Sequence, residues 1–289
     1  MLVLFTDTDC DVTPEIAATY GYRMISMPYS IDGKTVYPYE DFKEFDDHAY
    51  YEMLRGGVLP TTSAISEELY LKAFEPELAA GNDILYVHFS RAMSATFENM
   101  DKAVAKLRTK YPDRKFYEID TKAITIPCLN IAIEVGEMVK AGKTVEEILD
   151  WAKTEVDKFA VYFFADDLKF FQRSGRVGGL AGTMGTLLGI RPIIYMSSEG
   201  KMESVGKEKG RSKALARVLS YVDELGENVA DHRVIIAHCD CPQLADMAAA
   251  EMRKRFGDGL QILFSPVNPT AGAHCGPNCV GICFHAKHR

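Results

Sequence analysis

The chain lacks the features that would place it in a membrane or on nucleic acid. None of its apolar runs approaches the roughly 20 residues that a membrane-spanning helix needs. Its 33 Lys and Arg against 41 Asp and Glu give a net charge of -8, which counts against the clustered basic face of a nucleic-acid-binding protein. The opening residues 1–7 turn polar too early for a signal peptide. We therefore expect a cytoplasmic protein whose seven cysteines are reduced thiols.

Three common enzyme signatures are also absent. The sequence has no G-x-x-x-x-G-K-S/T loop for nucleotide phosphates, because the segment 200–207 has a different spacing and is followed by Glu208. No G-x-G-x-x-G turn follows the first predicted strand, and no G-x-S-x-G turn presents a nucleophilic serine. These absences count against a nucleotide-dependent enzyme or a hydrolase of a familiar kind.

What is present is an alternation of strands and helices in an α/β chain long enough for two cores. Short apolar runs at 2–6, 84–89 and 116–119 predict buried strands, and each is followed by a helical pattern. This alternation predicts a parallel sheet that is covered on both faces. Residues 28–60 interrupt it with aromatics, proline and glycine, and predict a hairpin excursion with an exposed helix.

A second unit begins after a bridging helix at 143–157. Its predicted strands lie at 159–164, 192–196, 201–205, 234–238, 260–264 and 279–284, and its helices at 212–225 and 244–256. We therefore expect an N-terminal α/β domain over residues 1–158 and a C-terminal α/β domain over residues 159–289.

Polar loops at strand ends are the first candidates for a site, because open parallel sheets bind ligands at the carboxyl ends of their strands. The aspartates of segment 6–11 lack the glycine and glutamate of a calcium loop, so we expect polar turn chemistry there. Thr62 and Ser63 precede a helix, where hydroxyl groups either cap the helix or hold a carboxylate. Ser94 lies between a buried strand and a helix, where it could either cap the helix or contact a ligand.

Two further candidates lie late in the chain. Segment 168–189 places Arg173 and Arg176 among apolar side chains and carries six glycines in fifteen residues. Arginine in an apolar setting needs an anionic partner, and the simplest is the acidic group of a long apolar molecule. His274 falls in the Gly- and Pro-rich segment 268–278, which we predict to be a loop between two strands. A loop histidine is a better site candidate than one on a helix face, although most are only solvated.

The cysteines allow a metal or redox alternative. Cys275, Cys279 and Cys283 are spaced by four, and Cys239 and Cys241 offer more ligands. A structural zinc site usually shows a close pair that is repeated elsewhere. If 279–284 is a strand, these residues are more simply small buried hydrophobes. We therefore predict no metal site.

The order and spacing of the motifs resemble the DegV family, the fatty-acid-binding proteins of mainly Gram-positive bacteria. The resemblance spans essentially the whole chain. It rests on T-D-T-D-C-D at 6–11, T-S at 62–63, S-R-x-x-S-x-T at 90–96, D-T at 120–121, S-G-R-V at 174–177, L-L-G-I-R-P at 187–192, G-R-S-K-A at 210–214 and H-C-G-P at 274–277.

The resemblance implies a DegV-like fold, in which a lipid tunnel separates an N-terminal parallel-sheet domain from a C-terminal domain with a mixed sheet. It implies that the carboxyl group of a long-chain fatty acid binds there, with no cofactor and no catalytic residue of the chain's own. The residues implied for that carboxylate are Thr62, Ser63, Ser94, Arg173, Arg176 and His274.

The resemblance also implies a partner, an ATP-dependent fatty acid kinase that converts the bound acid to an acyl phosphate for phospholipid metabolism. Lys209, Arg211 and Lys213 are candidates for docking that kinase, and otherwise form a solvated helix start. The chain departs from the family's last motif, Thr-His-x-Gly-Pro-Gly, because it has Ala273 and Asn278. That departure bears more on partner use than on lipid binding.

An alternative function is hydrolysis of an acyl ester or acyl phosphate by Ser94 and His274. Such a nucleophile needs a base within hydrogen-bond reach, and the sequence does not show whether these two side chains meet.

Overall fold

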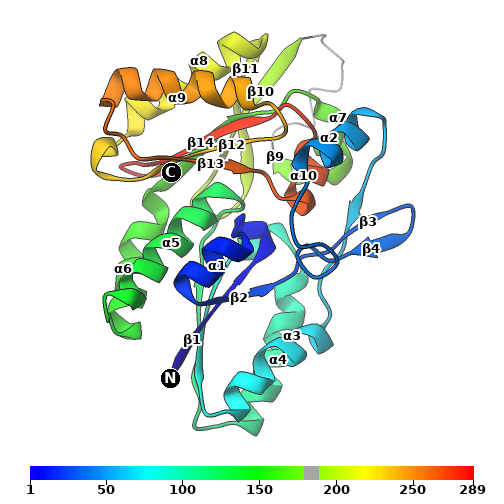
Figure 1. The fold of residues 1–289 in the computed structure, drawn as a ribbon, viewed down its shortest axis with the longest axis vertical. Helices are drawn as coiled ribbons and strands as arrows, with labels where there is room; N and C mark the ends of the chain where they lie inside the picture. The colour runs from blue at the N-terminus through cyan, green and yellow to red at the C-terminus, as the bar shows by residue number, and fades with distance from the viewer. Residues whose placement is uncertain (179–188) are drawn as a thin grey trace.

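The computed structural model describes residues 1–178 and 189–289. Figure 1 shows two α/β domains, with the N-terminal domain below and the C-terminal domain above. A small three-stranded sheet lies to one side of them. Within the described ranges, no helix is both long and apolar enough to cross a membrane.

The N-terminal domain is built on a four-stranded sheet of order β2-β1-β6-β7 whose strands all run parallel. Helix α1 packs on α5, and α3 packs on α4, so that the two pairs cover opposite faces of the sheet (Figure 1). The predicted parallel sheet with helices on both faces is therefore confirmed. Its elements are β1 (Leu2–Asp7), α1 (Pro14–Tyr20), β2 (Tyr22–Ile25), α3 (Glu67–Ala79), β6 (Asp83–His88), α4 (Thr96–Lys110), β7 (Phe116–Asp120), α5 (Ile126–Lys140) and α6 (Val145–Glu155).

Local signals in the sequence explain where several of these helices begin. Thr13 caps α1, because its hydroxyl accepts a hydrogen bond from the Ile16 N–H at 3.3 Å and Pro14 occupies the first helical position. Thr144 caps α6 in a reciprocal arrangement with the Glu147 side chain.

The excursion forms an antiparallel sheet of β4 (Lys34–Val36), β3 (Tyr29–Ile31) and β5 (Thr61–Thr62), with helix α2 (Asp47–Arg55) between β4 and β5. The prediction that this helix is exposed holds for one of its faces only. Tyr50, Tyr51 and Leu54 are buried, and the two tyrosine hydroxyls donate to the carbonyl groups of residues 269 and 267. The two tyrosines therefore pack α2 against the C-terminal domain, and the charged residues His48 and Arg55 contact Asp240 of the same domain.

The C-terminal domain holds a seven-stranded sheet of order β13-β12-β14-β8-β10-β11-β9. It is mixed, because β12 pairs with β13 and β11 pairs with β9 in parallel, whereas the other pairs are antiparallel. The six predicted strands are confirmed. The bounds are β8 (Phe159–Phe164), α7 (Leu168–Ser174), β9 (Val177–Gly178), β10 (Ile190–Met196), β11 (Met202–Lys209), α8 (Arg211–Leu225), β12 (Val234–His238), α9 (Pro242–Phe256), β13 (Ile262–Pro266), α10 (Pro269–Cys275) and β14 (Val280–His285).

The two faces of this sheet bury different partners. Tyr162, Ile236 and Ile282 belong to the core under α8 and α9, which cover the upper face in Figure 1. Their neighbours Val161 and Ile235 belong to the core that includes the N-terminal sheet and α5. Helix α5 contacts β8, β12 and β14, so it lies between the two sheets. Strand β8 begins directly after residue 158, where we place the domain boundary as a proposal.

Candidate functional site

A cavity with a volume of about 220 Å³ lies between the two domains. The ends of β1 and β6 and the beginning of α5 contribute from the N-terminal domain, and β8, β10 and β14 contribute from the C-terminal domain. It therefore opens at the carboxyl ends of the parallel strands, where ligands of such sheets bind. Most of the wall is apolar: Met27, Phe89, Met93, Ile124, Ile126, Val161, Phe163, Met196, Met202, Val267 and Val280.

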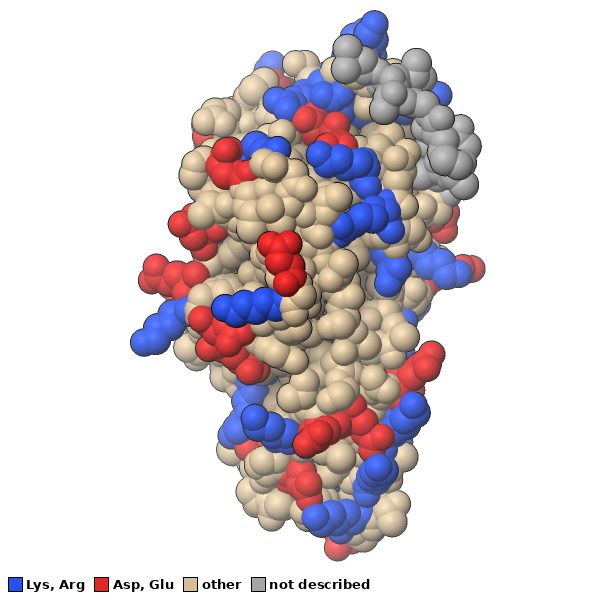
Figure 2. All heavy atoms as spheres, turned by 90° about the vertical axis from the view of Figure 1, so that its right-hand side faces the viewer, with Lys and Arg blue, Asp and Glu red and all other residues tan. Residues whose placement is uncertain are grey.

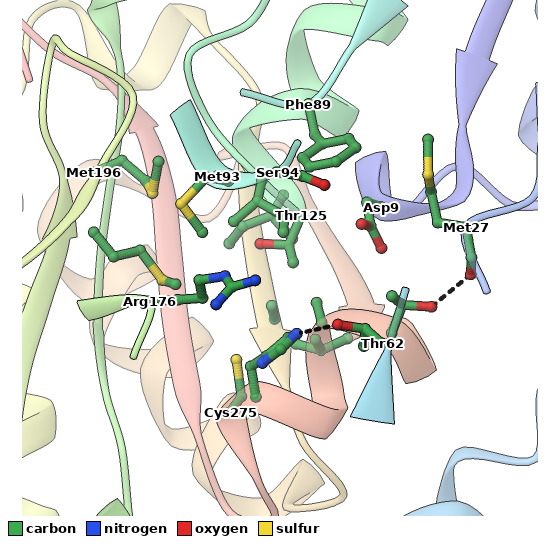
Figure 3. Close-up of a pocket in the computed structure, with 18 of the residues that line it drawn as sticks. Asp9, Met27, Thr62, Phe89, Met93, Ser94, Thr125, Arg176, Met196 and Cys275 are labelled. Carbon is green, nitrogen blue, oxygen red and sulfur yellow. Dashed lines mark hydrogen bonds between the residues drawn. The ribbon is translucent and has the colours of Figure 1, made fainter. Parts of the chain in front are cut away.

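Polar side chains line part of the same cavity (Figure 3). Five of the six side chains predicted for a carboxylate are among them: Thr62, Ser63, Ser94, Arg176 and His274. These residues are separated by up to 212 positions in the sequence and come from β5, the turns before α3 and α4, the turn before β9, and α10. The fold thus brings the five together in one cavity wall.

His274 and Thr62 form a pair in the cavity wall, with 3.0 Å between the imidazole Nε2 and the hydroxyl Oγ1. Burial lowers the pKa of His274 to about 4, and the nearby charges of Arg176 and Arg173 act in the same direction. The imidazole is therefore neutral at pH 7. It can accept one hydrogen bond and donate another without adding a charge to the cavity.

The segment around His274 is a helix, so the prediction of a loop was wrong. Asn268 caps α10 by accepting a hydrogen bond from the Ala271 N–H at 2.9 Å, and Pro269 occupies the first helical position. Gly276 ends it with a φ of 71°. Glycine and proline therefore mark the two ends of a short helix whose last turn holds His274 over the cavity.

Ser94 serves a local cap and faces the cavity at the same time. Its hydroxyl oxygen accepts a hydrogen bond from the Thr96 N–H at 3.2 Å, and the side chain lines the cavity (Figure 3). Its own O–H hydrogen stays available to an acceptor in the cavity. The two roles that the sequence left open are compatible.

The two arginines of the glycine-rich segment have different positions. Arg176 extends into the cavity (Figure 3), and its Nη1 donates to the Ser174 carbonyl at 2.7 Å. Arg173 does not line the cavity in the described structure. Its guanidinium donates to the carbonyl groups of Leu59, at 2.8 Å, and Pro60, directly before β5. Arg173 therefore holds the strand that carries Thr62. The glycines of 179–188 lie outside the described residues.

The predicted docking residues lie where β11 ends and α8 begins. Lys209 and Lys213 are exposed, whereas Arg211 is paired with Asp166, with 3.0 Å between its Nε and Oδ1. Figure 2 shows Lys and Arg side chains gathered on one face over the C-terminal domain, above a largely uncharged band. The docking role of these residues stays a prediction.

Three buried aspartates at the end of β1 were not recognised as part of the site from the sequence. The predicted polar turn is present as a 3-10 turn over Thr8–Cys10. Asp7 and Asp11 lie behind the cavity wall, and burial raises the pKa of each to about 7. Asp9 lines the cavity itself. Burial and the neighbouring carboxyl groups raise its pKa well above the ordinary value.

Several of the cysteines occupy buried positions, as expected for small hydrophobes. Cys239, Cys241, Cys279 and Cys283 are buried, and Cys275 is half-buried. Cys239, Cys275 and Cys279 contribute to the apolar wall of the cavity.

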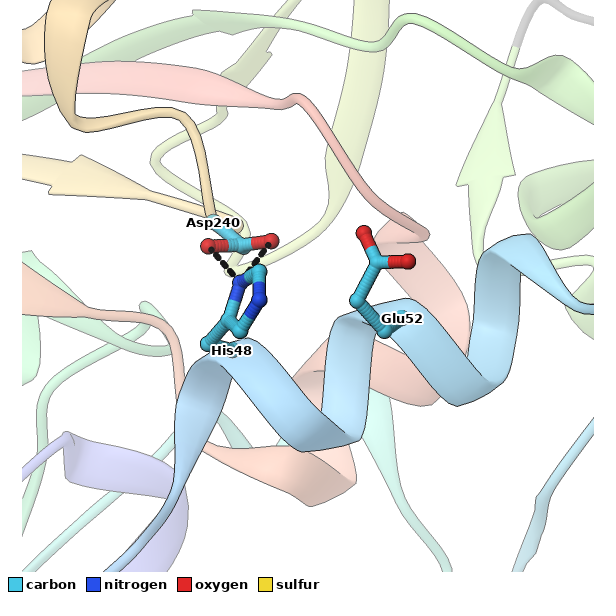
Figure 4. A group of neighbouring side chains, drawn as sticks. All are labelled: His48, Glu52 and Asp240. Atoms are coloured by element: carbon cyan, nitrogen blue, oxygen red, sulfur yellow. Dashed lines mark hydrogen bonds and ion pairs between the residues drawn. The ribbon is translucent and has the colours of Figure 1, made fainter.

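A separate cluster joins α2 to the segment after β12 (Figure 4). His48 Nδ1 lies 3.1 Å from Asp240 Oδ2, and Glu52 is close by. Arg55 donates to both carboxylates, including Glu52 Oε1 at 2.7 Å. An ion would have to displace that guanidinium, so the cluster is better explained as an ion-pair network between the excursion and the C-terminal domain.

The two residues that depart from the last motif lie in α10 and shortly after it. Asn278 has a φ of 62°, the left-handed region that asparagine tolerates better than most residues. Its Oδ1 accepts a hydrogen bond from Arg55 Nη2 at 2.9 Å, a contact that glycine cannot make. Ala273 is buried on α10.

The fold and the site together define a class: a two-domain α/β protein with an apolar cavity that ends in hydroxyl, imidazole and guanidinium groups.

The comparisons with known proteins agree. The family model described as "Uncharacterised protein, DegV family COG1307" matches residues 1–287. The chain therefore belongs to the DegV family. A DegV domain-containing protein of Clostridium perfringens is 29% identical over 282 residues, which cover 98% of this chain and 96% of the relative. A DegV domain-containing protein of Streptococcus pyogenes is 26% identical, with 96% of each chain covered.

Solved structures share the fold. A protein of Eubacterium ventriosum, described as binding stearic acid, has a TM-score of 0.87 and 20% identity, with 99% of each chain covered. A DegV family protein of Thermus thermophilus, described by its fatty acid binding, has a TM-score of 0.85 and 22% identity, again with 99% of each chain covered. At these identities the likeness establishes the fold, and the ligands remain those of the other proteins.

Proposed function

We propose that this protein binds a long-chain fatty acid, with the acyl chain in the apolar part of the cavity and the carboxylate at its polar part. The observation that carries the proposal is the single enclosed surface on which an apolar wall meets Arg176, Ser94 and Thr62. The fatty acids described for other DegV structures support it.

The electrostatics of the polar part suit one carboxylate. Among the described residues that line the cavity, Arg176 is the one cation. His274 is neutral at pH 7 because its pKa is lowered to about 4. A ligand anion would therefore be balanced by one guanidinium and by hydrogen bonds from Thr62, Ser63 and Ser94, which favour the charged form without a second ion pair. Arg173 would act indirectly, by positioning β5.

We further propose that the protein is a carrier that presents this carboxyl group to a separate fatty acid kinase for conversion to an acyl phosphate. Arg176 lines both the cavity and a neighbouring surface hollow that Ala92, Gly178 and Ser204 also line. The polar part is thus close to the surface, where a partner's active site can approach it. Lys209, Arg211 and Lys213 remain our candidates for docking that partner.

The hydrolase alternative has less support. His274 Nε2 is hydrogen bonded to Thr62, and the Ser94 oxygen accepts from the Thr96 N–H. A serine nucleophile needs a base hydrogen bonded to its own hydroxyl. We therefore favour the carrier.

The test is to purify the protein under native conditions, extract it with organic solvent and identify the extract by mass spectrometry. We expect a single long-chain fatty acid per chain. Arg176→Ala and Ser94→Ala should each weaken rebinding of that acid after delipidation by about tenfold or more, because each removes a hydrogen bond to a charged group. Arg253→Ala, which removes a half-buried arginine of α9 that does not line the cavity, is the matched control. A lipid-free extract with no later uptake would contradict the proposal.

A further inference from the structure

Asp9 is a buried carboxyl group in the cavity wall. It follows β1 in the turn Thr8–Cys10 and is 5% exposed. Its backbone carbonyl accepts a hydrogen bond from the Thr125 N–H at 2.7 Å, which ties the turn to the beginning of α5. Figure 3 shows its carboxyl group on the same side of the cavity as Phe89 and Met27, across from Arg176. The position is therefore fixed and faces the ligand space.

The carboxyl groups of Asp7 and Asp11, two residues to either side, accept hydrogen bonds, whereas no described residue donates one to the carboxyl group of Asp9. Asp7 Oδ2 accepts from the Tyr86 hydroxyl at 3.1 Å and the Phe89 N–H at 3.2 Å. Asp11 Oδ1 accepts from the Asn268 N–H at 2.9 Å and from its side-chain amide at 2.7 Å. Within the described residues, no side chain or backbone N–H donates to the Asp9 carboxyl group, and its Oδ1 is buried without a partner. A buried polar group in this position calls for a partner from the ligand.

The charges around Asp9 disfavour its ionised form. Asp7 and Asp11 add negative charge from the same turn, and burial removes water from all three carboxyl groups. Two influences oppose this: the N-terminus of α5, which favours an anion, and Arg176 across the cavity. Of the other titratable groups that face this region, Cys10 and Tyr86 beside Asp7 and His274 and Cys275 on α10 are neutral at pH 7. Burial opposes ionisation of Cys239 after β12, but hydrogen bonds from Cys275 and Cys279 lower the pKa of its thiol well below the ordinary value, and any charge on it is negative.

We propose that Asp9 stays protonated in the loaded protein and donates its hydrogen to the carboxylate of the bound fatty acid. The inference rests on the proposed function and assigns a further binding residue to that site. Arg176 would hold the carboxylate from one side and the Asp9 O–H from another. The two carboxyl groups then share one proton, and the unpartnered Asp9 oxygen gains the hydrogen bond that it lacks.

This arrangement makes ligand affinity depend on pH in one direction. A ligand carboxylate beside Asp9 favours the protonated acid, so the Asp9 pKa is higher in the loaded protein than in the empty one. Affinity is then greatest below the pKa of the empty protein and falls as pH rises, by at most about tenfold per pH unit, until the pKa of the loaded protein is reached. His274 has finished titrating well below this window. Asp7 and Asp11 titrate near 7 and need a control.

The experiment measures binding of a fluorescent fatty acid to delipidated protein from about pH 6 to about pH 9, a range in which the ligand monomer is ionised. Three variants are compared with the wild type. Asp9→Asn replaces the acid with an amide that donates at every pH, Asp9→Ala removes the donor, and Asp11→Asn removes a neighbouring buried carboxyl group that does not line the cavity. The melting temperature of each protein is recorded at each pH.

We expect the wild type and Asp11→Asn to lose affinity as pH rises and Asp9→Asn to keep a flat profile. Asp9→Ala should bind about 10- to 100-fold more weakly at the lower end of the range, since a hydrogen bond to a charged group is lost. Equal profiles for the wild type and Asp9→Asn, or wild-type affinity in Asp9→Ala, would overturn the inference while leaving fatty acid binding intact. A wild type that takes up no fatty acid at any pH would overturn both proposals.

Discussion

The substitution Asp11→Asn should stabilise the empty protein at alkaline pH. Asp11 is buried, its Oδ1 accepts two hydrogen bonds from Asn268, and its Oδ2 is buried without a partner. Burial raises its pKa from 3.8 to about 7, although the hydrogen bonds from Asn268 oppose the shift. The folded protein therefore binds this proton more tightly than the unfolded chain does.

The size of the effect follows from that difference in pKa. Because the folded-state pKa lies above the unfolded-state value, the stabilising contribution of the protonated carboxyl group is complete below pH 3.8 and is lost as pH rises to about 7. Each pKa unit corresponds to about 1.4 kcal/mol, so the loss between about pH 5 and about pH 8 is about 3 kcal/mol. An asparagine oxygen can accept both hydrogen bonds from Asn268 and does not titrate. Its amide N–H₂ replaces the unpartnered oxygen, at a cost of about 1–3 kcal/mol that is the same at both pH values.

Urea unfolding of the delipidated wild type and variant at about pH 5 and about pH 8 measures this difference. The free energy of unfolding of Asp11→Asn relative to the wild type should rise by about 3 kcal/mol between the two conditions. Asp101→Asn, which changes an exposed carboxylate on α4, should show no such rise. A constant difference between wild type and Asp11→Asn at the two pH values would refute the reasoning.

Two further predictions concern glycine and arginine positions near the site. Gly276→Ala should lower the free energy of unfolding by about 2–4 kcal/mol, because the residue has a φ of 71° and the added Cβ would collide with the Phe170 ring. Gly257→Ala has a similar positive φ but open space, so it should cost only about 1 kcal/mol, and equal losses in the two variants would contradict the clash. Arg173→Ala should cost about 1–2 kcal/mol of stability and weaken fatty acid binding, because the carbonyl groups of residues 59–60 lose their donor. Arg173→Lys should recover part of both, and unchanged urea unfolding and binding in Arg173→Ala would show that β5 does not depend on this contact.

The alternation of strands and helices could be predicted from the sequence because its signals are local. Buried strands such as β6 are short apolar runs, and α1 carries its own N-cap and first-turn proline. The order of strands in the C-terminal sheet has no such local signal. β14, the last strand of the chain, pairs with β8, which begins more than a hundred residues earlier. Contacts at that separation are decided by packing, which a pattern within one segment does not report.

The two helices that the sequence described least well, α2 and α10, contact each other. Helix α2 has charged residues that suggest exposure, but its Tyr50 and Tyr51 hydroxyls find carbonyl partners more than 200 residues away. Helix α10 is only seven residues long, and its glycine and proline were taken for loop residues although Pro269 and Gly276 mark its two ends. Tertiary packing explains the buried face of α2, whereas the ends of α10 carry local signals that its short length obscured.

The site shows the same division between residue type and placement. Hydroxyl, imidazole and guanidinium groups suited to a carboxylate could be selected from motif positions, and the structure places five of the six in one cavity wall. The sequence could not distinguish the roles of Arg173 and Arg176, because they lie only three positions apart in the same motif. In the structure Arg173 contacts backbone carbonyl groups, whereas Arg176 lines the cavity. Asp9 was missed for the opposite reason. In a sequence of alternating aspartates it is typical of a solvated turn, and only the fold shows that this turn is buried at the cavity wall. A carboxyl group at that place imposes a condition on any acidic ligand, which is that one of the two acids must keep its proton.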